Sequence, residues 1–137
     1  MGWYTSNILE VTGEENDLLK FDKSFRTNSS PSSKRIRFDK LYPVPEELLG
    51  DKERLYEWCD ENWGTYHGEC ECNEIIIQKN NITYTFETKW EPPFSWIDYV
   101  SKVFSDLEFH LEYDELVETS RGQQITVRCT EEWNSDV

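Results

Sequence analysis

The sequence predicts an α+β fold in which helices cover one face of an antiparallel sheet. Segments with strand periodicity and helical periodicity follow one another as strand, helix, strand, strand, helix, strand. This order is the split βαβ, or ferredoxin-like, plan. A long insertion follows the first helix, and an extra strand follows the last one. The chain of 137 residues suffices for a single core, so we expect one domain over 1–137.

The first predicted strand and helix are defined by the spacing of their apolar residues. The strand covers residues 4–13 and ends at Gly13, and the residues that share its inner face are Asn7, Leu9 and Val11. The helix covers residues 14–24. Its core residues recur at three- and four-residue steps, and they are Leu18, Phe21 and Phe25.

The insertion is predicted to contain a loop, an extended segment and a helix. Residues 26–37 are Ser-rich and basic, which is typical of a mobile loop. Pro43 and Pro45 favour an extended segment. We expect Phe38, Leu41 and Leu48 to anchor that segment to the core. Asp51 is the expected N-cap of a helix that ends near Gly64 and packs through Leu55, Trp58 and Cys59.

The second half of the chain predicts a hairpin, a helix and two further strands. A strand over 69–77 turns at residues 79–81 into an alternating strand over 82–90. Pro92 and Pro93 end that strand, and Pro93 suits the first helical position of the helix that follows. Alternation then predicts a strand over 107–114 and another over 125–129, with a frayed tail over 130–137.

The charge of the chain is strongly negative and unevenly distributed. The formal net charge is −14. Residues 1–50 hold 8 acidic and 7 basic residues, whereas residues 51–137 hold 20 acidic and 7 basic ones. A surface of this kind repels phosphate and disfavours direct binding of nucleic acid, but it attracts basic partners. The mean hydropathy of −0.78 and the lack of a long apolar run predict no membrane span.

Four short motifs occur in an order that is similar to a known family. They are Asn7-x-Leu9-x-Val11-x-Gly13, Phe38-x-x-Leu41-x-Pro43-x-Pro45-x-Glu47-Leu48, Asn62-Trp63-Gly64-Thr65 and Phe86-x-Thr88-x-Trp90-x-Pro92-Pro93. Together they resemble the YubB ferredoxin-like family of small proteins carried by bacterial plasmids, pathogenicity islands and phages. The resemblance implies the fold and a bacterial cytoplasm, and it implies no reaction.

An acidic and aromatic surface is the first candidate site. Alternating carboxylates on two strands predict two acidic rows on one sheet, and tryptophans in excess of what a small core needs predict exposed aromatics beside them. The candidate residues are Glu69, Glu71, Glu74, Glu108, Glu112, Asp114, Trp63 and Tyr66. Repeated carboxylates along a strand could mimic the phosphates of a nucleic acid and dock into a phosphate-binding groove.

Two further sets of residues predict alternative functions. Arg26, Lys34, Arg35 and Arg37 form the one dense basic cluster of the sequence, and with sheet aromatics they could bind a nucleotide or nucleic acid. The second set could hold zinc in a metal-dependent enzyme, although its spacing departs from the usual paired cysteines. The members of that set are Cys59, His67, Cys70 and Cys72.

Weighing these sites, we expect a non-catalytic interaction protein without a cofactor. Its predicted partner is a basic host or defence protein, most simply a nucleic-acid-binding enzyme, in a bacterial cytoplasm. An anti-CRISPR or anti-restriction inhibitor encoded by a phage or another mobile element is the concrete form of this hypothesis. The net charge over residues 51–137 and the family resemblance are its two supports.

Overall fold

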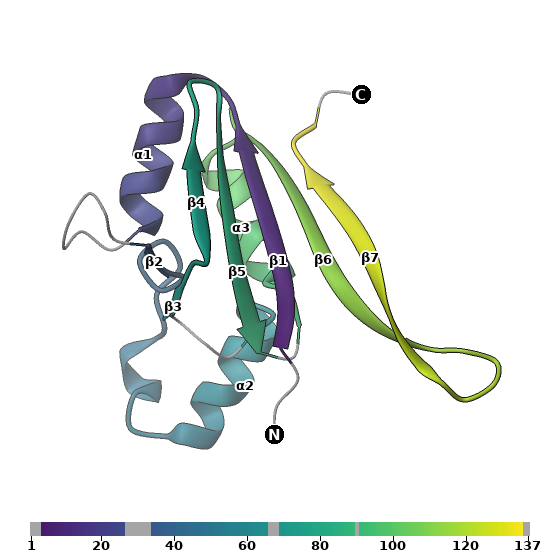
Figure 1. The fold of residues 1–137 in the computed structure, drawn as a ribbon. Coiled ribbons are helices and arrows are strands. Elements are labelled where there is room, and N and C mark those ends of the chain that lie inside the picture. Colours follow the sequence, from purple (N-terminus) through teal and green to yellow (C-terminus); the bar gives the residue numbers. More distant parts are fainter. Residues whose placement is uncertain (1–3, 27–33, 66–68, 90, 136–137) are drawn as a thin grey trace.

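The computed structural model describes residues 4–26, 34–65, 69–89 and 91–135, with the backbone alone for residues 69–71. Within these ranges, five strands form an antiparallel sheet in the order β4-β5-β1-β6-β7 (Figure 1). The strands are β1 (Tyr4–Thr12), β4 (Glu74–Ile77), β5 (Asn81–Lys89), β6 (Glu108–Glu118) and β7 (Gln124–Trp133). Helices α1 (Glu15–Phe25) and α3 (Phe94–Val103) cover one face of this sheet.

The chain path through this sheet is ferredoxin-like. Helix α1 connects β1 to β4, and these parallel strands are separated by β5. Helix α3 connects β5 to β6, and these two are separated by β1. Two interleaved split βαβ units of this kind define the fold. The predicted class is therefore confirmed, with the insertion after α1 and β7 as the additional strand.

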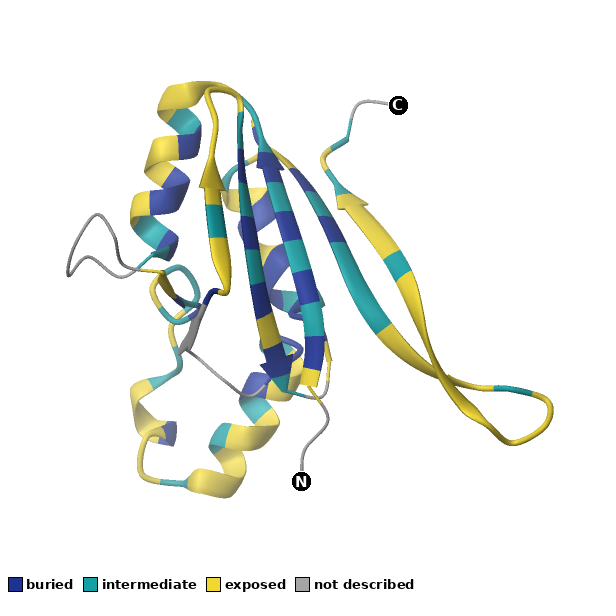
Figure 2. Ribbon diagram, viewed as in Figure 1, coloured by how far each residue is buried: buried dark blue, intermediate teal, exposed yellow. Residues whose placement is uncertain are grey.

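The core lies between the sheet and its two helices. Alternate residues of β1 and β5 are buried, as predicted, because side chains alternate between the two faces of a strand (Figure 2). Aromatic rings fill most of this space. The ring centroid of Phe21 lies 5.4 Å from those of Phe104 and Phe109, and Phe25 stacks on Trp96 at 4.8 Å. Pro93 is the N-cap of α3, one position before the predicted one.

The insertion is more ordered than the sequence indicates. It contains β2 (Arg35–Arg37), the 3-10 helix η1 (Glu46–Leu48) and α2 (Lys52–Asn62). The loop prediction is wrong for residues 35–37, because Ile36 is fully buried and draws its neighbours into a small sheet with β3 (Glu69–Glu71). Residues 27–33 lie outside the described ranges. The predicted cap is confirmed, since the Asp51 carboxylate accepts the backbone N–H of Arg54 at 3.2 Å.

The end of α2 requires a glycine. Gly64 has a φ of +83°, a region that L side chains rarely adopt. A Cβ at this position would lie 2.9 Å from the carbonyl oxygen of Pro92. The backbone N–H of Trp96 also donates to the carbonyl of Trp63 at 3.3 Å. The Trp-Gly-Thr segment therefore brings the end of α2 directly against the start of α3.

The strand predicted over 69–77 is divided into two strands, which corrects the prediction. Between β3 and β4, the Cys72 N–H donates to the carbonyl of Lys34, and the Asn73 N–H donates to the carbonyl of Thr85, each at 2.7 Å. These two successive bonds lead to different sheets. The chain therefore leaves the small β2–β3 sheet and enters the main sheet at this point.

Strands β6 and β7 form a long hairpin that extends beyond the rest of the sheet. Their pairing runs from Phe109–Trp133 to Glu118–Gln124, whereas β1 pairs with β6 only as far as Tyr113. The remaining part, residues 114–128, projects as a two-stranded arm whose side chains are mostly exposed on both faces (Figures 1 and 2). We call it the β6–β7 arm.

The prediction of a frayed tail from residue 130 is also wrong. Residues 130–133 belong to β7. The Trp133 indole N–H donates to the Asp98 carboxylate of α3, and the Asn134 amide donates to the carbonyls of Ser101 and Leu107 at 2.7 and 2.9 Å. These side-chain bonds fasten the end of the chain to α3. In the ranges given above, no helix combines the length and the apolar character that crossing a bilayer would need.

Candidate functional site

The face of the sheet opposite α1 and α3 is the candidate site, and we call it the open face. Over the described ranges, no helix or strand lies on it. Because side chains alternate along a strand, its residues are those between the buried positions. On the three central strands, the half-buried or exposed side chains of this face are Tyr4, Ser6, Ile8, Glu10, Thr12, Asn81, Thr83, Thr85, Glu87, Lys89, Glu108, His110, Glu112, Asp114, Leu116 and Glu118.

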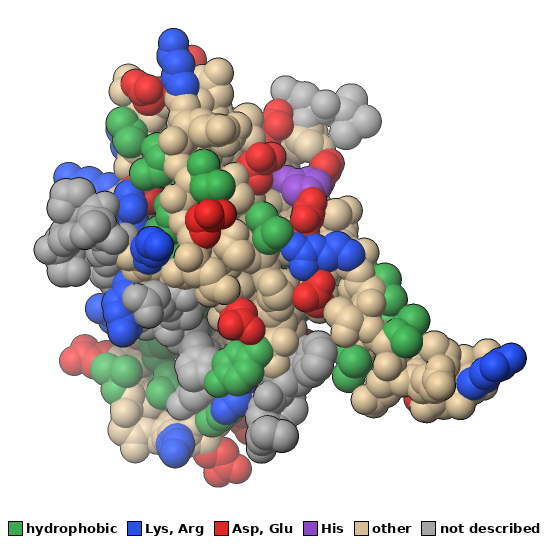
Figure 3. Space-filling model, viewed as in Figure 1, with side chains coloured by type: hydrophobic (Ala, Val, Ile, Leu, Met, Phe, Trp, Pro, Cys, Tyr) green, Lys and Arg blue, Asp and Glu red, His purple; other side chains and the backbone are tan. Residues whose placement is uncertain are grey.

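Carboxylates dominate the charge of the open face. Strand parity and register place eight acidic side chains on it, contributed by all five strands. They are Glu10, Glu74, Glu87, Glu108, Glu112, Asp114, Glu118 and Glu132. Only two basic side chains, Lys89 and Arg128, share the described part of this face. Figure 3 shows acidic side chains around the histidine on this side of the molecule.

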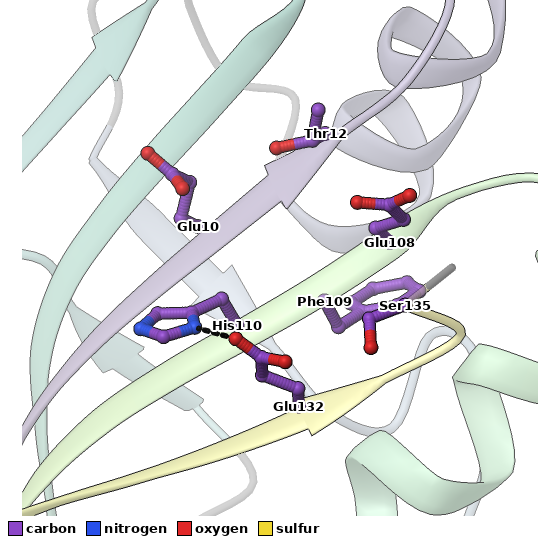
Figure 4. Close-up of a pocket in the computed structure, with 7 residues that line it drawn as sticks. All are labelled: Glu10, Thr12, Glu108, Phe109, His110, Glu132 and Ser135. Atoms are coloured by element: carbon purple, nitrogen blue, oxygen red, sulfur yellow. Dashed lines mark hydrogen bonds and ion pairs between the residues drawn. The ribbon is translucent and has the colours of Figure 1, made fainter. Parts of the chain in front are cut away.

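His110 lies at the centre of the densest acidic group. Glu10 is directly across from it on β1, and Glu132 is directly across on β7. Its Nδ1 lies 3.1 Å from a Glu132 oxygen, and its Nε2 lies 4.0 Å from a Glu112 oxygen. Figure 4 shows Glu10, Glu108 and Glu132 around a shallow hollow beside the imidazole. Thr12, Phe109 and Ser135 complete its lining.

Arg128 is held by the carboxylates around it. Its Nη1 donates to Asp114 at 2.8 Å, and its Nη2 lies 3.5 Å from a Glu112 oxygen. The hydrogen bond from Arg128 to Asp114 is the main cause that raises the pKa of the guanidinium, and the charges of both carboxylates add to it. Arg128 therefore neutralises part of the negative charge of Asp114 and Glu112. The other carboxylates of the open face remain in excess over its basic side chains.

The structure brings together part of the predicted acidic surface. Glu108, Glu112 and Asp114 share the open face as predicted, and Glu74 lies on the same face at the β4 edge. The second predicted row is wrong as a continuous row, because β3 belongs to the other sheet. Tyr66 and the side chains of Glu69 and Glu71 lie outside the described residues.

Trp63 is a core residue, which corrects its predicted place on the partner-binding surface. It is 2% exposed, and its indole N–H donates to the carbonyl of Tyr42 at 2.9 Å. The prediction of exposed tryptophans fails more generally within the described ranges. Trp96 is fully buried, and Trp58 and Trp133 pack against the core. Trp3 and Trp90 are not described.

The predicted basic cluster is partly neutralised by neighbouring carboxylates. Arg26 donates to Asp22 at 2.5 Å, and Arg37 donates to both oxygens of Asp39 at 2.9 and 2.5 Å. Lys34 and Arg35 are exposed. All four basic residues lie at the end of α1 or at β2, away from the open face (Figure 1). The cluster and the sheet aromatics therefore do not form one surface.

The predicted zinc ligands are only partly described. Cys59 and Cys72 are buried in the core, whereas His67 and the side chain of Cys70 lie outside the described residues. Among the side chains that the structure places, no three His, Cys, Asp or Glu residues gather as metal ligands.

Cys59 is expected to be protected from thiol reagents in the folded protein. Burial raises the pKa of Cys59 from 9.0 to about 11, so its contribution to stability is complete below about pH 9 and is lost as the pH rises towards 11. At pH 8, a thiol reagent should label half-buried Cys129 in the native protein and Cys59 only in denaturant. Mass mapping of the labelled peptides checks this. Equal labelling rates for Cys59 with and without denaturant would contradict it.

Four acidic members of the open face were not among the site residues predicted from the sequence. Glu10 lies between Leu9 and Val11, and the same alternation that placed those two in the core places Glu10 on the other face. Glu87 follows from the alternation of β5 in the same way. Glu118 and Glu132 required the full length of the β6–β7 hairpin, which the periodicity does not define.

Comparison with known proteins identifies the family. A family model described as the ferredoxin-like domain in Api92-like protein matches residues 58–134, from the second half of α2 to the residue after β7. No curated protein and no solved structure matches the chain. The matched segment is more than half of the 137 residues and includes β3 to β7 and α3. The chain therefore belongs to the family of the ferredoxin-like domain in Api92-like protein.

Proposed function

We propose that this protein is a non-catalytic interaction protein whose open face binds a basic surface of another protein. The observation that carries the proposal is the excess of carboxylates on a sheet face that no described element covers. Such a face attracts a basic partner over a distance and orients it before contact. Its half-buried threonines and Ser6 add uncharged polar groups around the charges.

The partner that fits this surface is a protein that itself binds nucleic acid. Alternate residues of a strand are about 6.8 Å apart and neighbouring strands about 4.8 Å apart, so the face repeats negative charge in two directions. A groove that binds phosphates meets a similar repetition of negative charge along a nucleic acid. The open face would act as a mimic that occupies such a groove.

The biological setting that we propose comes from the motif resemblance. The four motifs resemble the YubB family of plasmid, island and phage proteins, and a mobile element benefits from inhibiting a host nuclease or restriction enzyme. We therefore propose an anti-defence role, of the anti-CRISPR or anti-restriction kind, in the cytoplasm of a bacterial host. The acidic open face supports this role through its charge alone.

Direct binding of nucleic acid is the less favoured reading. The eight carboxylates of the open face would repel phosphates. The basic residues that could attract them lie elsewhere, and Arg26 and Arg37 already pair with Asp22 and Asp39. A sheet face that stacks bases also needs several aromatic side chains, and Tyr4 and His110 are the only rings that the described central strands present there.

The proposal predicts a salt-sensitive complex that depends on the central carboxylates. The tagged protein is used as bait in nuclease-treated bacterial lysate, and a retained basic nucleic-acid-binding protein is then purified for titration. The triple variant Glu10→Gln, Glu108→Gln, Glu112→Gln should bind it about tenfold more weakly, at about 0.5 kcal/mol for each exposed charge. Raising the salt concentration should weaken the wild-type complex.

The matched control removes the same number of charges from α2. Glu53→Gln, Glu57→Gln and Asp60→Asn alter exposed side chains that are not on the open face, and this variant should bind like the wild type. If both triple variants weakened binding equally, the loss of affinity would come from the change in net charge and not from the position of the carboxylates. Binding unaffected by salt and by the open-face variant would reject the proposal. A labelled oligonucleotide bound by the wild type, and released on Arg35→Gln with Arg37→Gln, would favour the nucleic-acid reading instead.

A further inference from the structure

Strand β7 is a long edge strand. It forms one end of the five-stranded sheet, and within the described ranges no strand pairs with its outer side. Every second one of its ten residues therefore directs its backbone N–H and C=O groups outward. Strand β4, at the opposite edge, has only four residues. The β7 edge is thus the larger unpaired backbone surface of this sheet.

The residues that direct their backbone groups outward can be assigned from the turn of the hairpin. The Thr119 N–H donates to the Gln123 carbonyl at 2.7 Å, so these two residues form a hydrogen-bonded pair. Hydrogen-bonded pairs alternate along antiparallel strands. The odd-numbered residues of β7 therefore bond to β6, and the even-numbered ones face outward. The outward residues are Gln124, Thr126, Arg128, Thr130 and Glu132.

We propose that β7 pairs antiparallel with β7 of a second copy of this chain, in the register centred on Thr130. In this register Arg128 lies opposite Glu132 of the second copy, and the two-fold symmetry repeats the pair. Both side chains are partly exposed, Arg128 at 39% and Glu132 at 55%, and Arg128 would add the Glu132 of the second copy to its existing pairs with Asp114 and Glu112. Opposite charges directly across two strands stabilise their pairing.

The charges select this register over its neighbours. A register centred on Arg128 would place the two arginines opposite each other, and one centred on Glu132 would do the same for the two glutamates. Like charges directly opposite are destabilising. Registers centred on an odd-numbered residue also pair the outward N–H and C=O groups, since even-numbered residues again meet even-numbered ones. They place Arg128 and Glu132 opposite other residues, however, so Thr130 is the one centre that brings Arg128 opposite Glu132.

The side chains on the opposite face of the joined β7 strands are also compatible with this register. In the Thr130 register, Val127 lies opposite Trp133 of the second copy, so each exposed valine gains an aromatic neighbour. Val127 is 38% exposed in the single chain, and the partly buried Trp133 lies at the sheet edge beside Phe94. The two apolar pairs and two ion pairs would join both sheets into one. This inference does not depend on the proposed function.

A disulfide test reads the register directly. Cys129 lies opposite Glu131 of the second copy, in a pair without hydrogen bonds whose Cα atoms are about 4.5 Å apart, within the range of a disulfide. The variant Glu131→Cys should form a covalent dimer under mild oxidation, and the peptide 129–137 should be recovered as a disulfide-linked dimer. The control Gln124→Cys places a cysteine outside the paired segment and should remain monomeric on a non-reducing gel. The oxidised wild type should not yield this linked peptide, because only a register centred on residue 129 places Cys129 opposite Cys129 of the second copy. Absence of the linked peptide from the variant, or its presence in the wild type, would overturn the register.

Sedimentation at physiological salt tests the dimer itself. The wild type should show a concentration-dependent dimer, although the net charge of −14 opposes association at low salt. Thr130→Pro removes an outward N–H that β6 does not use, so it should fold normally and remain monomeric. Gln124→Pro removes an outward N–H beyond the paired segment and should still dimerise.

Charge reversal provides a second, independent test. Arg128→Glu and Glu132→Arg should each abolish the dimer, and the double variant should restore it. Salt separates this dimer from the complex of the proposed function, because screening relieves the repulsion between two copies but weakens binding to a basic partner. A wild type that stays monomeric at all concentrations, or a Thr130→Pro variant that still dimerises, would overturn the proposal.

Discussion

Replacing Asp22 with alanine is expected to lower the free energy of unfolding by about 3–5 kcal/mol. Asp22 lies on α1 and is 7% exposed. It accepts a hydrogen bond from the Tyr84 hydroxyl of β5 at 2.7 Å and one from the Arg26 guanidinium at 2.5 Å. Its removal would leave both donors without this partner in a mostly buried place. The substitution would therefore loosen the contact between α1 and the sheet.

A comparison with Tyr84→Phe separates the two interactions of Asp22. Burial, followed by the charge of Asp22, raises the pKa of Tyr84 well above its usual value, so its hydroxyl remains a neutral donor. Loss of that hydroxyl alone should lower the stability by about 1–3 kcal/mol. Urea unfolding followed by tryptophan fluorescence measures each variant, with the exposed Lys20→Ala on the same helix as control. A loss below about 1 kcal/mol for Asp22→Ala would contradict the expectation.

Local periodicity predicted most of the sheet and its helices. Strand β5 is an example, because every second residue from Ile82 to Thr88 is buried and the pattern depends on that strand alone. Helix α3 is another, since Pro93 and the spacing of Ile97 and Val100 mark its start and inner face within the sequence. Features that depend on neighbouring residues of the chain can be predicted without knowledge of the three-dimensional structure.

The wrong predictions concern features that distant residues decide. The break at Cys72 is set by two carbonyls, those of Lys34 and Thr85, that come from different sheets. The end of β7 is fixed by the bond from Trp133 to Asp98 on α3. Trp63 is buried because Tyr42 accepts its indole N–H. None of these partners is near in sequence, so periodicity carries no sign of them.

The candidate site also combines features that local periodicity predicts with features that distant residues decide. Alternation in β6 placed Glu108 and Glu112 on one face from the sequence alone. The neighbours of His110 on β1 and β7 follow from strand order and register, which no local pattern reveals. The sequence could therefore predict an acidic strand. The grouping of Glu10, His110 and Glu132 across three strands required the structure.

The second large effect is expected for Trp96→Ala, which should lower the free energy of unfolding by about 3–5 kcal/mol. Trp96 is fully buried on α3. Its ring lies 4.8 Å from Phe25 and 5.0 Å from Phe38, and its indole N–H donates to the Phe38 carbonyl at 2.8 Å. One side chain thus links α3, α1 and the insertion. The alanine variant would create a cavity between them and remove one of the two hydrogen bonds of the Phe38 carbonyl, which also accepts the Tyr42 N–H at 3.2 Å.

Trp96→Phe distinguishes these two causes, because it retains an aromatic ring and removes only the indole N–H and part of the volume. We expect this variant to lose about 1–3 kcal/mol, from the lost hydrogen bond to the Phe38 carbonyl and from incomplete filling of the space. Val103→Ala on the same helix, at a residue that is 54% exposed, serves as the control and should lose less than the Trp96 variants. Urea unfolding followed by circular dichroism is suitable, since the substitution itself alters fluorescence. If Trp96→Ala and Val103→Ala were equally stable, Trp96 would not hold the insertion on the core, and the motif Phe38-x-x-Leu41 would require another anchor.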